Sequence, residues 1–286
     1  RGLGDVYKRQ TYNFHMLSKF HKKNDDVTLD SLSNTNWSKK KEKAKARIYD
    51  HASEILEIES ERLKASSYSL KVSDEDYLLF LKDFPFEDTD DQRIVSSDIR
   101  KDLSLVKPMN RLLCGDVGFG KTEIAIRSAF ITVYSEKQAI ILSPSTVLTE
   151  QHYESFTQRF RNFPVTIKKL SRNTSIKEKQ KLYDDFNNKK IDLLTGTHAL
   201  FNENLSFENV GLIVVDEEHR FGAKQKNLIK HKQLSTHILY MSATPIPKTM
   251  NMAFSGLKDF SFLSTPPPKR LSIKTFLEVS NNAIIK

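Results

Sequence analysis

Gly115-Asp116-Val117-Gly118-Phe119-Gly120-Lys121-Thr122 places three glycines within six residues, whereas residues 5–114 contain none. Glycine tolerates positive φ and lets successive backbone N–H groups approach phosphate oxygens closely. The spacing G-x-x-x-x-G-K-T is that of the P-loop, which cradles phosphates at the N-terminus of a helix. Taken alone, the stretch also fits an ordinary glycine-rich turn between a strand and a helix. As a P-loop, it predicts nucleotide binding by Gly115, Gly118, Gly120, Lys121 and Thr122.

A second segment supplies what a hydrolytic nucleotide site needs besides the loop. Residues 212–215 form an apolar run, Leu-Ile-Val-Val, and the acidic residues Asp216, Glu217 and Glu218 follow it directly. Lys121 would neutralise charge on the β- and γ-phosphates, and Thr122 and Asp216 would hold Mg²⁺ directly or through water. Glu217 would orient and deprotonate the attacking water. The alternative is a polar strand end, which the P-loop upstream disfavours.

Short apolar runs alternate with helical stretches from residue 108 onward. This alternation implies right-handed crossovers onto a mostly parallel sheet, with ligands at the carboxyl ends of the strands. The fold class expected is therefore α/β, a P-loop lobe with a parallel sheet flanked by helices. The expected strands are residues 112–114, 139–143, 165–170, 192–195, 212–215 and 238–241, and the expected helices are residues 122–134, 149–160 and 175–186.

Residues 38–84 contain no glycine or proline, and Ala44, Ile48, Ala52, Ile55 and Ile58 recur among charged residues as a narrow apolar stripe. The spacing of three and four predicts a long amphipathic connecting helix, with a short helical segment at the end of this interval. The basic run at residues 39–47 fits a solvated helix face better than a binding site.

Composition narrows the class of protein. The chain has 286 residues, a formal net charge of +9 and one cysteine. The basic excess suggests an anionic partner, and the single cysteine, Cys114, fits a buried strand position in a cytoplasmic protein. No apolar run is long enough for a transmembrane helix, so no membrane partner is expected. Residues 1–11 lack an initiator Met and are expected to be non-native and disordered.

The order Asp-Glu-x-His at residues 216–219 resembles the corresponding motif of superfamily 2 helicases and translocases. Other segments occur in that family's order. Residues 89–92 resemble the adenine-recognising Q motif, residues 144–152 motif Ia, residues 196–200 motif Ib and residues 242–249 motif III. The resemblance implies catalytic roles for Lys121, Asp216, Glu217 and His219, with Gln92 on the adenine and Phe84 or Phe86 near it.

Motifs Ia and Ib are implied to grip the nucleic-acid backbone, and motif III to couple the ATP site to that track. Hydroxyls and backbone amides suit phosphate contacts, which carry no base specificity. Arg172 either adds charge to this surface or is simply solvated. The residues implied are Ser145, Thr146, Gln151, Arg172, Gly196, Thr197 and His198 for DNA, and Ser242, Ala243 and Thr244 for coupling.

A narrower resemblance, from about residue 14 to residue 286, is to the bacterial transcription-repair coupling factors. It rests on residues 116–119, 216–222 and 265–276, together with residues 17–20 and 37–39 upstream. The fork-reversing, branch-migration helicases share parts of these motifs. They usually have Ser at the position of Phe119 and Gln at that of Glu218, and they lack the upstream helix. Lys248, where Arg is usual, keeps the charge.

The resemblance implies an ATP- and Mg²⁺-dependent translocase on double-stranded DNA that displaces stalled RNA polymerase and recruits nucleotide excision repair proteins. Within it, residues 12–37 would end an RNA-polymerase-interacting module, residues 38–84 would form the connecting helix and short helical segment, and residues 85–265 the first motor lobe. Residues 266–286 would be a linker and the start of a truncated second lobe. The chain is then expected to be a monomer with little ATPase activity alone. The alternatives are a branch-migration helicase and a nucleotide-gated RNA-polymerase-binding module.

Overall fold

The structure is a computed structural model that describes residues 41–42, 57, 60–62, 64–171, 174–200, 204–217, 234–243 and 258–268. The chain divides into two compact units, Arg1–Ile55 and Leu56–Lys286. Of the first unit, only Lys41 and Glu42 are described, and both are helical. The predictions for residues 1–37 and 269–286 lie outside the described residues. The fold below is that of the second unit.

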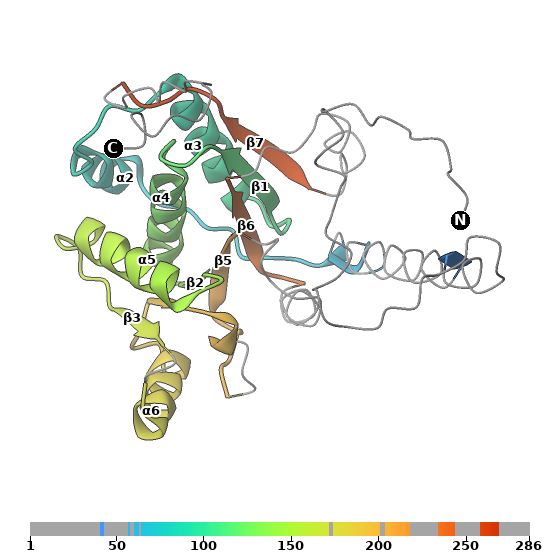
Figure 1. Cartoon of the computed structure of the whole chain (residues 1–286), viewed down its shortest axis with the longest axis vertical. Helices are drawn as coiled ribbons and strands as arrows, with labels where there is room; N and C mark the ends of the chain where they lie inside the picture. Colours follow the sequence, from blue (N-terminus) through green and yellow to red (C-terminus); the bar gives the residue numbers. More distant parts are fainter. Residues whose placement is uncertain are drawn as a thin grey trace, which may run out of the picture. The chain divides into compact units, whose positions relative to one another are not determined.

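A seven-stranded sheet forms the centre of this unit, in the order β3-β4-β2-β5-β6-β1-β7 (Figure 1). All of its strand pairs are parallel. The predicted α/β class is therefore confirmed, and six of the strands match the predicted apolar runs. The strands are β1 Asn110–Gly115, β2 Gln138–Leu142, β3 Ile167–Leu170, β4 Leu193–Gly196, β5 Val210–Asp216, β6 His237–Ser242 and β7 Asp259–Leu263.

Alternate residues of the strands enter two separate cores, as parallel strands covered on both faces require. On one face, Leu113, Ile141 and Val214 pack with residues of helices α2, α3, α4 and α5. On the other, Leu112 and Ile213 belong to a core that includes residues of α6. The helices are α2 Asp74–Lys82, α3 Asp90–Leu103, α4 Lys121–Tyr134, α5 Thr146–Arg159 and α6 Ile176–Asn187, with a 3₁₀ turn, η2, at His198–Leu200.

The segment before α3 belongs to this core. Residues 60–62 and 64 are helical, residues 65–73 are not, and α2 then forms the expected short helical segment. The backbone N–H groups of Ser67 and Leu70 donate to the carbonyl oxygens of Val106 and Leu103 and not to a preceding helical turn. Leu70 is buried and Phe80 stacks on Phe130 with 4.0 Å between ring centroids. The compact lobe thus extends upstream of residue 85.

A buried histidine fastens this segment to the amino end of the sheet. His237, at the start of β6, accepts a bond at Nδ1 from the Met109 N–H (3.0 Å), and its Nε2 lies 2.7 Å from the Tyr68 carbonyl oxygen. Nε2 therefore carries the proton of a neutral ring, because the carbonyl can only accept. Burial lowers the pKa of His237 to about 4.

This contact predicts acid lability. A histidine with a lowered native pKa stabilises the fold above its unfolded-state pKa, and this stability is lost as the pH falls towards the native pKa. Between pH 7 and pH 5 the unfolding free energy should fall by about 2 kcal/mol through this residue. Urea unfolding of the chain at both pH values measures it. The decline should shrink in His237→Asn and persist in the exposed control His198→Asn. An equal decline in all three proteins would contradict the assignment.

No helix among the described residues is long and apolar enough to cross a membrane.

Candidate nucleotide site and nucleic-acid edge

The P-loop joins β1 to α4 and has the backbone that its glycines predict. Gly118 and Gly120 have φ values of 80° and 92°, in the left-handed region that other residues rarely adopt. Gly120 is the N-cap of α4 and supplies no side-chain cap. The first N–H groups of α4 are therefore left to an anionic ligand, as in phosphate sites at helix N-termini.

Gln92 braces this loop from α3. Its side chain forms a capping box with Thr89, and its Nε2 donates to the Phe119 carbonyl oxygen at 2.9 Å. A Cβ on Gly120 would lie 2.3 Å from that Nε2, so a side chain there would displace the Gln92 amide in addition to the strain of the positive φ. Gln92 therefore connects the Q-motif segment directly to the phosphate loop.

Lys121 lies at the centre of the site. Its ammonium donates to the carbonyl oxygens of Gly115 (2.6 Å) and Asp116 (3.0 Å). Burial lowers its pKa, and the carboxylates of Glu217 and Asp216 oppose that shift. The charges of these three residues are thus close enough to interact, as a site for phosphate and metal requires.

Glu217 adopts a strained backbone at the end of β5. Its φ of 51° is unusual for a residue with a side chain and costs about 1–3 kcal/mol. The conformation is held from β6, because Glu217 N–H donates to the Met241 carbonyl (2.9 Å) and the Ala243 N–H donates to Glu217 Oε1 (3.0 Å). The predicted coupling residue Ala243 therefore touches the predicted catalytic carboxylate. Ser242 is buried beside it, whereas His219 and Thr244 lie outside the described residues.

Asp216 lies at the same strand end and contacts α5. Its Oδ2 is 2.8 Å from His152 Nε2, and both side chains are buried. The sequence had shown His152 only as part of motif Ia, and nothing in the spacing indicated this contact. Among the described residues, no three His, Cys, Asp or Glu side chains gather into a metal cage. A hydroxyl and one carboxylate, from Thr122 and Asp216, instead suit Mg²⁺ that also binds phosphates and water.

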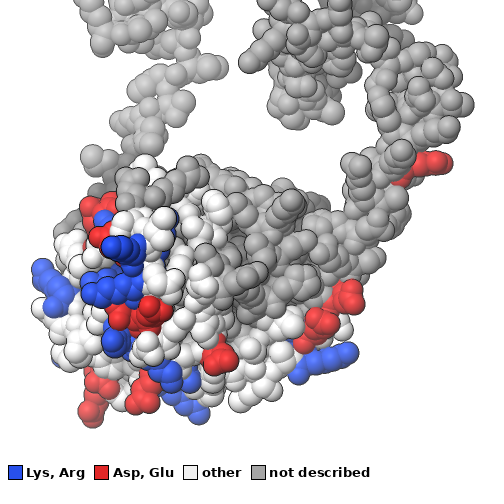
Figure 2. Space-filling view, turned by 90° about the horizontal axis from the view of Figure 1, so that it is seen from below, with Lys and Arg blue, Asp and Glu red and all other residues white. Residues whose placement is uncertain are grey.

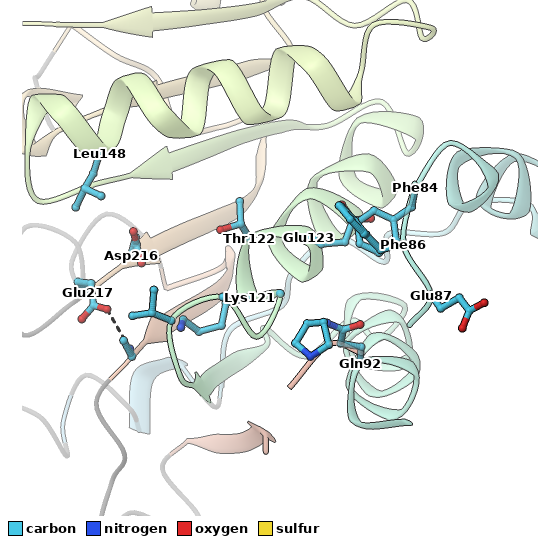
Figure 3. Close-up of a pocket in the computed structure, with 15 residues that line it drawn as sticks. Phe84, Phe86, Glu87, Gln92, Lys121, Thr122, Glu123, Leu148, Asp216 and Glu217 are labelled. Carbon is cyan, nitrogen blue, oxygen red and sulfur yellow. Dashed lines mark hydrogen bonds between the residues drawn. The ribbon is translucent and has the colours of Figure 1, made fainter. Parts of the chain in front are cut away.

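One cavity of about 600 Å³ collects these groups. Figure 3 shows Asp216 and Glu217 on one side of Lys121, and Phe84, Phe86 and Gln92 on the other. This arrangement separates a charged end from an aromatic and amide end, as a nucleotide's phosphates and base require. The cavity is lined by Phe84, Phe86, Glu87, Gln92, Val117, Gly118, Gly120, Lys121, Thr122, Glu123, Leu148, Asp216, Glu217, Ala243 and Pro267.

Buried ion pairs support the aromatic end. Arg127 of α4 makes two 2.8 Å bonds to the Asp88 carboxylate and one of 2.9 Å to Glu123. The same guanidinium lies 5.1 Å from the centre of the Phe84 ring, and Arg159 of α5 also bonds to Glu123. Removing one member of such a cluster leaves an uncompensated buried charge. The cluster fixes the segment that carries Phe84 and leads into the Q motif.

Asp91 links the nucleotide site to the residues that follow β7, a contact that the sequence did not predict. Its Oδ2 accepts the N–H groups of Ser264 and Thr265, each at 2.8 Å, and these bonds lower its pKa. Gly115 also approaches Leu263 so closely that a Cβ there would lie 2.9 Å from the Leu263 Cβ. The chain leaving β7 is thus held beside the phosphate loop.

The residues implied for DNA follow two neighbouring strands. β2 and β4 pair in parallel, with Leu142 opposite Gly196, so motifs Ia and Ib emerge at the same edge. Thr146, Gln151 and His198 are exposed there. The Ser145 hydroxyl caps α5 by accepting the Leu148 N–H, and Thr197 is buried. Arg172 lies outside the described residues.

Surface charge is mixed on the face shown in Figure 2. Lysine and arginine side chains are interspersed there with aspartate and glutamate over the described residues. The contacts expected of motifs Ia and Ib use hydroxyls, amides and the N-terminus of α5, and such groups position a nucleic-acid backbone without reading bases.

Residues 89–253 match the family described as DEAD/DEAH box helicase. The chain is 41% identical over 275 residues to the transcription-repair-coupling factor of Haemophilus influenzae, covering 96% of this chain and 24% of that protein. The factor of Escherichia coli is 40% identical over 275 residues, with the same coverage. The chain thus spans about a quarter of the length of these curated relatives.

Solved structures agree with the fold. A structure of RecG bound to a three-way DNA junction has a TM-score of 0.65 and 33% identity, covering 77% of this chain and 31% of that one. A DEAD box protein from Methanococcus jannaschii has a TM-score of 0.51 and 21% identity, covering 70% of this chain and 56% of that one. The second likeness concerns the fold alone.

Proposed function

The chain belongs to the DEAD/DEAH box helicase family, and on that premise we propose that it is the ATP-binding motor lobe of a transcription-repair-coupling factor. Its parent would be a DNA-dependent ATPase that moves along double-stranded DNA, displaces stalled RNA polymerase and recruits nucleotide excision repair proteins in the cytoplasm. One observation carries the proposal: a single cavity collects Gln92, Lys121, Thr122, Asp216 and Glu217. The relatives' name then selects this activity among those of the family.

Five of the residues that line the cavity have proposed roles. Lys121 neutralises phosphate charge, and the N–H groups of the P-loop bind phosphate oxygens. Thr122 and Asp216 would hold Mg²⁺, which would supply positive charge against the β- and γ-phosphates when bound. Glu217 takes the proton of the attacking water. The hydrogen bond that its Oε1 accepts from the Ala243 N–H fixes the orientation of the carboxylate. Gln92 recognises the base, and His219 remains a predicted member of the site.

The nucleic-acid contacts proposed are backbone contacts. Ser145, Thr146 and Gln151 of motif Ia and residues 196–198 of motif Ib would contact phosphates along one edge of the sheet. Binding of this kind weakens steeply with added salt and carries no sequence preference. We expect the 286-residue chain to be a monomer. We also expect it to turn over ATP slowly, because it spans about a quarter of the length of its relatives.

The test is release of a stalled RNA polymerase. Polymerase halted by nucleotide omission on linear DNA is incubated with the full-length parent and ATP, and retained transcript is measured. The wild type should release it, and Lys121→Ala should not. Release by both proteins, or by neither, would refute the proposal. If neither releases it but the wild type prefers forked to linear DNA, the branch-migration helicase is favoured.

A further inference from the structure

The contact between His152 and Asp216 is a buried polar bond that joins α5 to the end of β5. His152 is 6% exposed and Asp216 9% exposed, and the two polar atoms are 2.8 Å apart. Buried polar groups of this kind are costly unless they are satisfied. The bond occupies only Oδ2, and Oδ1 of Asp216 accepts no hydrogen bond from the residues that the structure describes. One oxygen is therefore fixed while the other remains available to the cavity.

Helix α5 presents two different faces at this point. Leu148 lines the nucleotide cavity, and His152 lies one turn later on the same face, at the i+4 position. Phe156, a further turn along, is fully buried and lies edge-on to the His152 ring. Thr146 and Gln151 are exposed. The same rigid helix thus carries the proposed DNA-contacting side chains and the histidine that holds Asp216.

We propose that His152 is a positioning residue that orients Asp216 for Mg²⁺ and transmits nucleic-acid binding at α5 to that carboxylate. The inference rests on the proposed function, because it concerns the same site. A displacement of α5 by DNA moves His152 and so changes the orientation of Asp216. Partners of this kind, one step behind a metal ligand, typically change metal affinity about 10- to 100-fold when they are replaced.

The experiment uses the full-length parent and three substitutions. His152→Leu removes the N–H group that donates to Asp216. His152→Gln keeps an N–H group near the position of Nε2. His152→Asn also carries an amide N–H, but its side chain is too short to reach Asp216. Binding of a fluorescent ATP analogue is titrated with Mg²⁺, and ATP hydrolysis is compared with and without DNA. Glu154→Gln, an exposed change on the same helix, is the control.

His152→Leu and His152→Asn should need about tenfold more Mg²⁺ for half-maximal binding and lose most of the DNA stimulation, whereas His152→Gln and the control stay near wild type. If the Leu variant fails to fold, the Asn and Gln variants decide. Unchanged Mg²⁺ dependence in the Asn variant overturns the inference, even if its melting temperature falls. The proposed function fails separately, if the wild type shows no Mg²⁺-dependent binding or no DNA stimulation.

Discussion

Glu217→Gln in the full-length parent is expected to lower DNA-stimulated ATP hydrolysis by about 10²- to 10⁴-fold, the usual contribution of a general base. The substitution keeps the size of the side chain and an amide oxygen that can still accept the Ala243 N–H bond. It removes the negatively charged carboxylate that accepts a proton from the attacking water. Nucleotide affinity should therefore change little, because Lys121 and the P-loop are untouched. Steady-state phosphate release at saturating DNA measures the loss.

The matched control is Glu208→Gln, a change of the same kind at a position outside the cavity. It should leave turnover and nucleotide binding at wild-type values. Turnover of Glu217→Gln within a fewfold of wild type would remove Glu217 from the catalytic role and leave it as a structural link between β5 and β6.

The second large effect concerns the 286-residue chain itself. Compared with its full-length parent, it should hydrolyse ATP about 10³- to 10⁵-fold more slowly at saturating DNA, the cost of a missing arginine finger. The family resemblance places that arginine in a second motor lobe. The cavity in this lobe contains Lys121 as its cation, and no arginine lines it among the described residues. Phosphate release by the two proteins at equal concentration gives the ratio.

Nucleotide binding distinguishes the loss of the arginine finger from misfolding of the site. The chain should still bind a fluorescent ATP analogue, because the P-loop, Gln92 and the Phe84 segment are complete within it. Lys121→Ala in the same chain should abolish this binding. Turnover within tenfold of the parent would show that the described site needs no second lobe.

The sequence predicted most of the sheet, because strands buried on both faces read as continuous apolar runs. It missed β7, whose residues alternate in burial at the edge of the sheet. The P-loop and the acidic strand end were recognisable because their chemistry fixes residue types at fixed spacing. His152 and Asp91 were not, since their contacts join positions 64 and 173 residues away. Local pattern contains no information about such pairs, and only the assembled sheet brings them together.

The pairing of β7 with β1 has a mechanical consequence. The two strands are parallel over five residue pairs, from Arg111 opposite Asp259 to Gly115 opposite Leu263. Tension applied beyond residue 265 along the axis of β7 first meets the two bonds at Asp91, and then loads the inter-strand bonds together in shear. Bonds that must break together resist more force than bonds peeled one at a time. A force applied to the chain after β7 is therefore transmitted to Gly115, the first residue of the P-loop.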